Sequence, residues 1–157
     1  MKQQKFFNYH FSSKKNHDNY FVNQTNQKAY DLIFLEEINQ NIIFFGPKKS
    51  GNSYLASLWK DKNNAISYNN NLSNIIEIKK NVVVDDFLGK SSDENLFHII
   101  NHCKLYNLKM YFVSSVDINT YNFKFRDLYY RLREFFYLEI KKPDDEMCKM
   151  LMVKLFS

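Results

Sequence analysis

Residues 41–59, NIIFFGPKKSGNSYLASLW, decide the fold of this 157-residue chain. The first five are a short apolar run of β-forming residues, which has the length of a buried strand. Residues 46–51, GPKKSG, have the composition of a loop. Residues 52–59 predict a helix, and its inward face consists of Tyr54, Leu55, Leu58 and Trp59. We therefore expect a strand, a glycine loop and a helix in direct succession.

This succession is the frame of the phosphate-binding P-loop, whose pattern is G-x-x-x-x-G-K-[ST]. Gly46, Gly51 and Ser53 fall on the pattern, but Asn52 stands where the pattern has lysine. In a P-loop the backbone N–H groups and the helix N-terminus point at an anion, and the lysine adds a full charge at the outer phosphates. Asn52 can donate only a neutral hydrogen bond. We expect this loss to weaken nucleotide binding by about 1.5–3 kcal/mol and to prevent useful hydrolysis.

Two alternatives remain open for this loop. Lys48 or Lys49 could supply the missing charge, which would leave an active ATPase. The loop could also be a glycine turn with no ligand. If ATP or ADP does bind, we expect contacts from the whole loop and the first helical turn, that is from Gly46, Pro47, Lys48, Lys49, Ser50, Gly51, Asn52, Ser53 and Tyr54.

A second informative stretch is residues 81–86, NVVVDD, about 30 residues further on. Three valines predict a buried strand, and two carboxylates follow at its carboxyl end, where open parallel sheets bind ligands. This is the Walker B pattern. Asp85, with Ser53, would hold Mg²⁺, and Asp86 would orient or activate water. The alternative is that the two acids merely end a strand.

The remaining segments alternate between strands and helices. Strands are predicted at residues 64–68, 109–115 and 137–140, and helices within 20–38, 72–80, 91–107, 125–133 and 143–156. Thr25 or Asn26 is expected to cap the first helix, and the last helix is expected to pack on the sheet through Met147, Leu151, Lys154 and Leu155. Ser114 and Ser115 end one strand, where a sensor residue would reach a γ-phosphate, although ordinary strand-end serines would look the same.

This alternation predicts an α/β fold with a parallel sheet covered on both faces, a three-layer αβα sandwich. We expect one core domain over residues 20–157 and an extended tail over residues 1–19. The net charge of +5 permits an acidic partner, but no recognition helix or basic stripe supports direct DNA binding. No apolar run is long enough to span a membrane, and the two cysteines lack metal or disulfide spacing, so we expect a cytoplasmic protein.

Taken together, the residues resemble the AAA+ module of the bacterial replication initiator DnaA, and more closely its shorter relatives of the Hda type, the regulatory inactivators of DnaA. The degenerate P-loop and VVVDD are joined by four local matches in family order: DNYFVNQTNQKAYDLI, ENLFHIINHCK, RDLYYRLR and PDDEMCKMLMVKLF. The resemblance implies a P-loop NTPase core with a five-stranded parallel sheet. In these relatives a helical lid with a second sensor arginine follows the core, and we expect both to be absent here.

The resemblance also implies partners and a mode of action. In that family a Gln-led N-terminal peptide binds the DNA polymerase sliding clamp, and Gln4, Phe7 and Tyr9 would correspond to it. Arg131 matches an arginine finger that acts on ATP held by a neighbouring subunit. Tyr130 departs from the serine that precedes this arginine in the family, and Arg126 departs from a proline. We therefore expect a regulator of replication initiation that contacts DnaA and the clamp and hydrolyses little or no ATP itself; self-association stays open.

Overall fold

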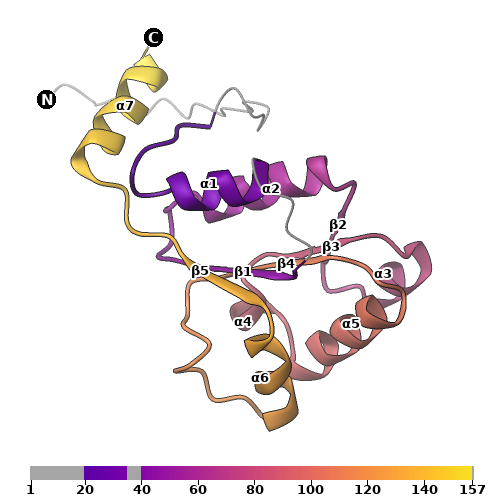
Figure 1. The fold of residues 1–157 in the computed structure, drawn as a ribbon. Coiled ribbons are helices and arrows are strands. Elements are labelled where there is room, and N and C mark those ends of the chain that lie inside the picture. The colour runs from indigo at the N-terminus through magenta and orange to yellow at the C-terminus, as the bar shows by residue number, and fades with distance from the viewer. Residues whose placement is uncertain (1–19, 35–39, 157) are drawn as a thin grey trace, which may run out of the picture.

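The computed structural model describes residues 20–34 and 40–156. The expected tail, with Gln4, Phe7 and Tyr9, lies outside the described residues. Every predicted strand and helix is present, and a short helix that was not predicted, α4, follows β3. The elements in chain order (Figure 1) are α1 (Gln27–Phe34), β1 (Ile42–Phe45), α2 (Asn52–Lys62), β2 (Ile66–Ser67), α3 (Leu72–Ile78), β3 (Val82–Val84), α4 (Phe87–Lys90), α5 (Asp93–Leu105), β4 (Met110–Ser114), α6 (Arg126–Arg133), β5 (Phe136–Glu139) and α7 (Asp145–Phe156).

The five strands form one parallel sheet in the order β2-β3-β4-β1-β5. Strand β4 lies between β1 and β3, so the strand that precedes the P-loop does not touch the strand that ends in the two aspartates. The register pairs Phe45 with Ser114 and Val84 with Phe112. The carboxyl ends of β1, β4 and β3 therefore lie side by side at one edge of the sheet, as expected for a ligand site.

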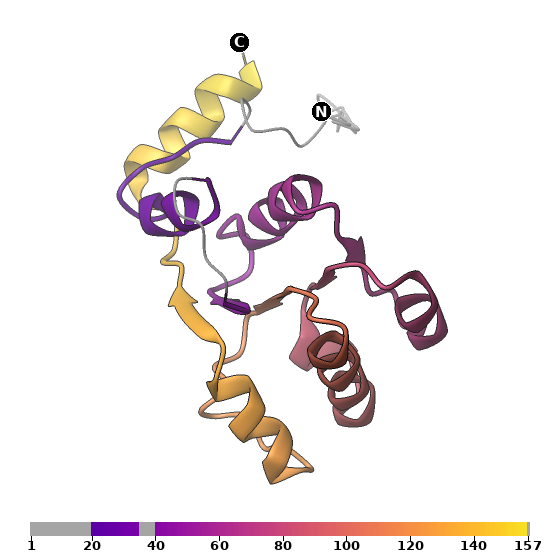
Figure 2. The same cartoon turned by 45° about the vertical axis from the view of Figure 1, so that its right-hand side comes forward.

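Helices cover both faces of the sheet (Figure 2). On one face, α1 and α2 pack on the sheet through a cluster that contains Leu32, Leu55 and Trp59. On the other, α3, α4, α5 and α6 pack through a larger cluster that contains Ile100 and Leu128. Because successive side chains of a strand point to opposite faces, β4 gives Tyr111 to the first cluster and Phe112 to the second. The predicted three-layer α/β fold is confirmed.

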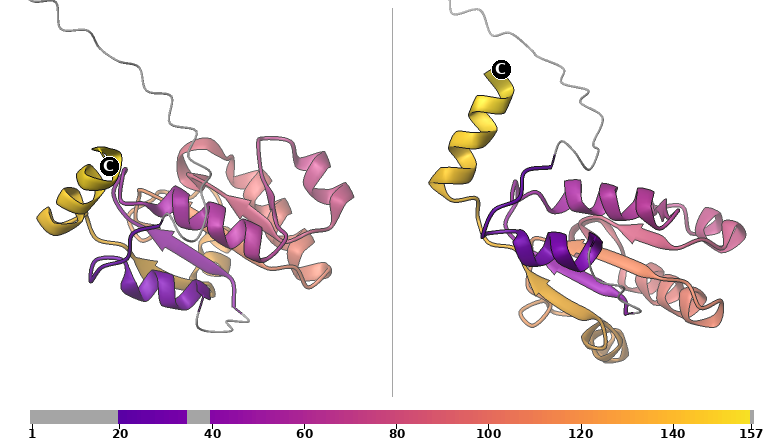
Figure 3. Two further views of the ribbon diagram at one scale, coloured as in Figure 1. Left: turned by 90° about the horizontal axis from the view of Figure 1, so that it is seen from above. Right: turned by 45° about the horizontal axis from the view of Figure 1, so that its top comes forward.

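Helix α7 departs from the prediction. Asp144 caps it by accepting a hydrogen bond from the backbone N of Met147, and the Nδ2 of Asn23 donates to the same carboxylate oxygen. Met147 is buried, but residues 150–153 are 41–64 % exposed. The expectation that Leu151 packs on the sheet is wrong, because α7 stands apart from the sheet (Figure 3). The side chains of Lys154 and Leu155, which the prediction also includes, lie outside the described part of the structure.

Asn26 directly precedes α1, and its carbonyl accepts from the backbone N of Tyr30 at 3.0 Å in the first turn of the helix. Its side chain, however, bonds to the segment before the helix. The Oδ1 of Asn26 accepts from the backbone N of Asn23, and its Nδ2 donates to the Tyr20 hydroxyl and to the carbonyl of Phe21. Asn26 thereby fixes the segment before α1 against the back of the P-loop. Among the described helices, none is long and apolar enough to cross a bilayer.

Candidate nucleotide-binding site

The predicted P-loop bridges a central strand and a helix. The backbone N of Gly46 donates to the carbonyl of Ser114 at 3.1 Å, which ties the start of the loop to β4. A Cβ at Gly46 would lie 2.5 Å from the carbonyl oxygen of Ile140, so only glycine fits there. Gly51 ends the loop with φ of 90°, in the left-handed region that favours glycine, and α2 begins at the next residue. Both glycines of the motif therefore have a geometric reason.

Asn52, at the lysine position of the motif, points beneath the loop. Asn52 is only 7 % exposed. Its Nδ2 lies 2.9 Å from the position that a Cβ of Gly46 would take. The buried Oδ1 of Asn52 and the buried Oγ of Ser50 have no hydrogen-bond partner among the described residues. The loop thus holds unpaired polar atoms next to its backbone donors, and the lysine position adds no charge.

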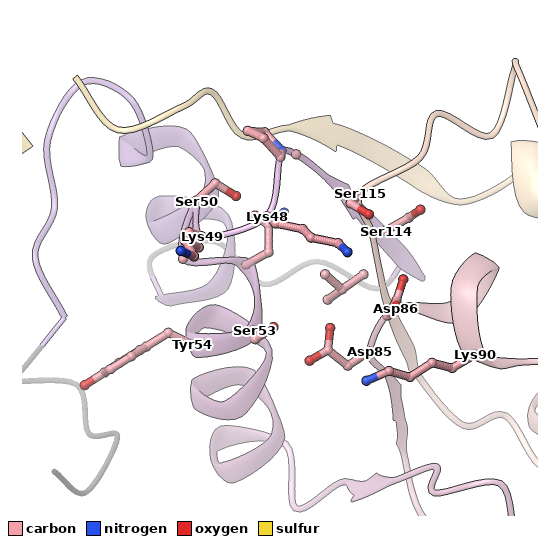
Figure 4. A pocket seen from close by; sticks show the side chains of 15 residues that line it. Lys48, Lys49, Ser50, Ser53, Tyr54, Asp85, Asp86, Lys90, Ser114 and Ser115 are labelled. Atoms are coloured by element: carbon pink, nitrogen blue, oxygen red, sulfur yellow. The ribbon is translucent and has the colours of Figure 1, made fainter. Parts of the chain in front are cut away.

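The loop opens onto a cavity of about 460 Å³ at the carboxyl edge of the sheet. All of the predicted loop residues, together with Asp85, Asp86, Ser114 and Ser115, line this cavity. In Figure 4 the Lys48 side chain extends from the loop toward the strand ends that carry Ser114 and Asp86, whereas Tyr54 points away from them. The predicted site residues of the loop and of both strand ends therefore meet in one place.

The two aspartates end β3 as expected. Asp85 is exposed, and Asp86 has φ of 50° and precedes α4, whose first turn hydrogen-bonds to its carbonyl. Ser53, the exposed hydroxyl at the start of α2, lines the same cavity as Asp85. A hydroxyl and a carboxylate are the kind of ligands that hold Mg²⁺ beside nucleotide phosphates. Ser53 and Asp85 are therefore the residues that could hold such an ion, and Asp86 lines the same cavity.

The two serines that end β4 differ in their availability. Ser114 is buried, and its hydroxyl donates to the carbonyl of Val116 at 2.7 Å while accepting from the backbone N of Val116 at 2.9 Å. Its hydroxyl is therefore committed to the turn that ends the strand. Ser115 is partly exposed in the cavity wall and is the better placed of the two to meet a ligand.

Sequence reasoning missed two residues of this region. Lys90 reaches the cavity from α4, and its Nζ points toward Asp85 (Figure 4). Tyr20 lies behind the loop: its ring would contact a Cβ at Gly51 and stacks near Tyr30 and Tyr54. Burial raises the pKa of Tyr20 well above its usual value. A lysine four residues after Asp86, at the end of a short helix, was the only available sign of Lys90.

Behind the loop, a smaller cavity of about 140 Å³ lies between the segment before α1, the P-loop and α7. It is lined in part by Tyr20, Asn26, Gly51, Tyr54 and Met147. Tyr54 lines both cavities, and its side chain points away from the strand ends (Figure 4). The cavity behind the loop is the more apolar of the two and includes the rings of Tyr20, Phe21 and Tyr54.

Arg131 does not join this site. It lies on α6, where its Nε is 3.2 Å from the Oδ2 of Asp127, its Nη1 donates to the Oδ1 of Asn101, and its guanidinium lies 4.6 Å from the centre of the Phe97 ring. The neighbouring histidines also form no site. His98 is exposed and His102 is buried, burial and Lys79 lower the pKa of His102, and no metal-ligating cluster occurs among the described residues.

No protein-family model and no curated protein matches the sequence. Solved structures do. AMPPCP-bound DnaA from Aquifex aeolicus matches with a TM-score of 0.73 at 18% identity over 92% of this chain and 55% of that one. The replication initiator DnaA bound to AMPPCP and single-stranded DNA gives 0.74 at 17% over 92% and 55%. Domain III of the DnaA protein from Thermotoga maritima gives 0.68 at 14% over 91% and 75%.

This chain spans about half the length of the first two of these structures. At such identities the likeness concerns the fold, and it agrees with the sheet order, the glycine loop and the paired strand ends described above. The chain has the α/β P-loop NTPase fold of AAA+ domains, in the form seen in DnaA.

Proposed function

We propose that this protein is a DnaA-related AAA+ regulator of chromosomal replication initiation that acts through protein contacts and turns over little or no ATP itself. The observation that carries the proposal is Asn52, a neutral residue buried beneath an otherwise complete P-loop. A loop that keeps its shape without its cation retains a binding surface and loses transition-state stabilisation. The DnaA-like fold supports a partner in replication initiation.

The proposed partners are DnaA and the sliding clamp. We propose that Gln4, Phe7 and Tyr9 contact the clamp, and that Arg131 acts in trans on ATP held by DnaA. Arg131 would have to leave Asp127 and Asn101 to do so. An exposed ion pair contributes only about 0.2–1 kcal/mol, so binding to a partner's phosphates can replace it. Self-association of this chain is not required.

The test measures the ATPase activity of DnaA in the presence of clamp loaded on DNA, with and without this protein. We expect stimulation that is lost in Arg131→Ala and retained in Arg133→Ala, an exposed arginine on the same helix. Absence of stimulation, or equal activity of the two variants, would contradict the proposal. Gln4→Ala should abolish clamp binding without changing the stability of the fold.

A second candidate function is ATP binding with Lys48 or Lys49 in place of the P-loop lysine. The observation that favours it is the Lys48 side chain, which extends toward the strand ends across the cavity (Figure 4). The aromatic cavity behind the loop would accept the base, and Ser53 and Asp85 would hold Mg²⁺. This candidate requires micromolar affinity for ATP–Mg²⁺ by calorimetry, lost in Lys48→Ala and in Asp85→Ala. Binding that survives both substitutions would refute it.

A further inference from the structure

A groove lies between the first turns of α5 and α6, apart from the nucleotide cavity. Two cavities form it, and they share Glu94. The first, of about 220 Å³, is lined by Glu94, Phe97, His98, Phe125 and Asp127. The second, of about 370 Å³, is lined by Ser92, Asp93, Glu94, Tyr121, Asn122 and Lys124. We call the two together the α5/α6 groove; none of its residues lines the nucleotide cavity.

The smaller cavity of the α5/α6 groove is mainly apolar. Phe97 packs partly against the core, and Phe125 precedes α6 with 38 % of its surface exposed. The two rings line one cavity, so the apolar surface there is contiguous and not a single exposed side chain. The two phenylalanines can therefore hold the apolar stem of an inserted side chain.

Charge in the α5/α6 groove is opposite to that of the whole chain. Three carboxylates line the groove, those of Asp93, Glu94 and Asp127, against the single ammonium of Lys124. The chain as a whole has a net charge of +5. Asp93 accepts a hydrogen bond from the backbone N of Lys124, and Asp127 is paired with Arg131. Glu94 has no ion pair within the described residues and lies where the two cavities meet. A cation is therefore the complementary ligand.

Arg131 provides an example of this chemistry within the chain. Its guanidinium lies over the Phe97 ring at 4.6 Å while its Nε contacts Asp127. An aromatic ring beside a carboxylate holds a guanidinium through both the ring quadrupole and the ion pair. On the other side of the groove the Nζ of Lys124 lies 5.7 Å from the centre of the Phe125 ring, and Glu94 is the groove carboxylate without an ion pair among the described residues.

We propose that the α5/α6 groove binds an extended basic segment of a partner protein. One arginine or lysine side chain enters the cavity between Phe97 and Phe125, and its cation pairs with Glu94. The neighbouring polar cavity, with Ser92 and Asn122, accepts the backbone of the same segment. This site requires neither nucleotide nor the action of Arg131 in trans, so it goes beyond the proposed function and can be tested apart from it.

The test titrates the full chain with a nine-residue Gly/Ser peptide that has one central arginine, and follows the ring resonances of His98 by NMR. Matched peptides carry norleucine or glutamate at the central position. We expect saturable shifts with the arginine peptide and about three- to tenfold weaker binding of the norleucine peptide. The dissociation constant should also rise with salt concentration, because the pair is partly exposed.

Glu94→Gln removes the charge from an exposed position. It should weaken the binding of the arginine peptide by about three- to tenfold and leave the binding of the norleucine peptide unchanged. Glu77→Gln, an exposed change on α3 outside the groove, is the matched control and should have no effect. Equal binding of arginine and norleucine peptides would overturn the proposal in favour of a purely apolar site. Equal effects of the two glutamine variants, or no saturable shift, would overturn it altogether.

Discussion

Two regions of the molecule, the P-loop and helix α6, treat positive charge in opposite ways. The P-loop has the glycines, the backbone donors and the facing carboxylates of a nucleotide site, but a neutral asparagine stands at its lysine position. Helix α6 has Arg131, which we propose acts on a partner's nucleotide, and Asp127 and Asn101 hold its side chain within the chain. The loop therefore lacks the lysine charge of its motif, whereas α6 has an arginine whose charge is paired within the chain.

The largest effect is expected at Gly46, which tests whether the loop geometry is required at all. Gly46→Ala places a Cβ against the backbone carbonyl of Ile140, and backbone cannot move aside easily. We expect a loss of about 3 kcal/mol in the free energy of unfolding, measured by urea denaturation.

Gly89→Ala is the control for that change. Its Cβ would meet the carboxylate of Asp86, the end of a side chain that can rotate, and alanine favours the helix. We expect a change within about 1 kcal/mol. Equal losses in the two variants would mean that the loop has no special requirement for glycine.

The second effect sharpens the comparison by restoring charge to the loop. Asn52→Lys supplies the cation of the motif, and we expect ATP–Mg²⁺ to bind about ten- to a hundredfold more tightly by calorimetry. Asn52→Gln is longer but neutral and should leave the affinity unchanged. If both variants bind alike, charge is not what the loop lacks.

The third effect concerns the arginine of α6. Arg131→Ala removes the contacts to Asp127, Asn101 and Phe97, and we expect it to lower the free energy of unfolding by about 1 kcal/mol. Arg133→Ala, which loses only a distant contact with the Tyr129 ring, should cost less than half as much. Thermal or urea denaturation measures both. Equal free energies of unfolding for the two variants would show that the contacts of Arg131 do not stabilise the domain, and the contrast with the loop would then be wrong.

The smallest effect concerns the α7 cap, which lies behind the loop. Hydrogen bonds from the backbone of Met147 and from Gln24 and Asn23 lower the pKa of Asp144 below its ordinary value of 3.8. A lowered pKa means that the ionised carboxylate stabilises the cap above pH 3.8 and that this stabilisation is lost as pH falls through the folded pKa.

We therefore expect the amide signal of Met147 to move on acidification below about pH 4 before the core signals do, as followed by NMR. Asp144→Asn should remove this pH dependence, and Asp145→Asn should not. Simultaneous loss of cap and core signals would show that α7 is part of the core.

Local patterns in the sequence predicted the strands and the P-loop, because the conformation of a strand or a loop depends largely on residues that are close together in the chain. The strand of three valines and the two glycines of the loop are of this kind, and the structure confirms both. Cys103, one of the two cysteines without metal or disulfide spacing, is buried in the core, and burial raises its pKa to about 12.

Long-range contacts could not be predicted in the same way. The partner of Arg131 on α5, Asn101, is 30 residues away, and the burial of Asn52 depends on its approach to Gly46 beneath the loop. The α7 prediction was wrong because it relied on the apolar residues of the helix alone. These residues surround the helix, and hydropathy does not say which side, if any, meets the sheet.

The position of β1 in the sheet has a consequence for the order of folding. Its two neighbours, β4 and β5, come late in the chain, and the side chain of Asn41 just before β1 accepts a hydrogen bond from Met110, 69 residues further on. Contacts between distant segments form slowly, because a long loop must close first. During synthesis, β1 therefore has no partner strand until β4 has been made and keeps one open edge until β5 follows, and an unpaired apolar strand is prone to aggregate.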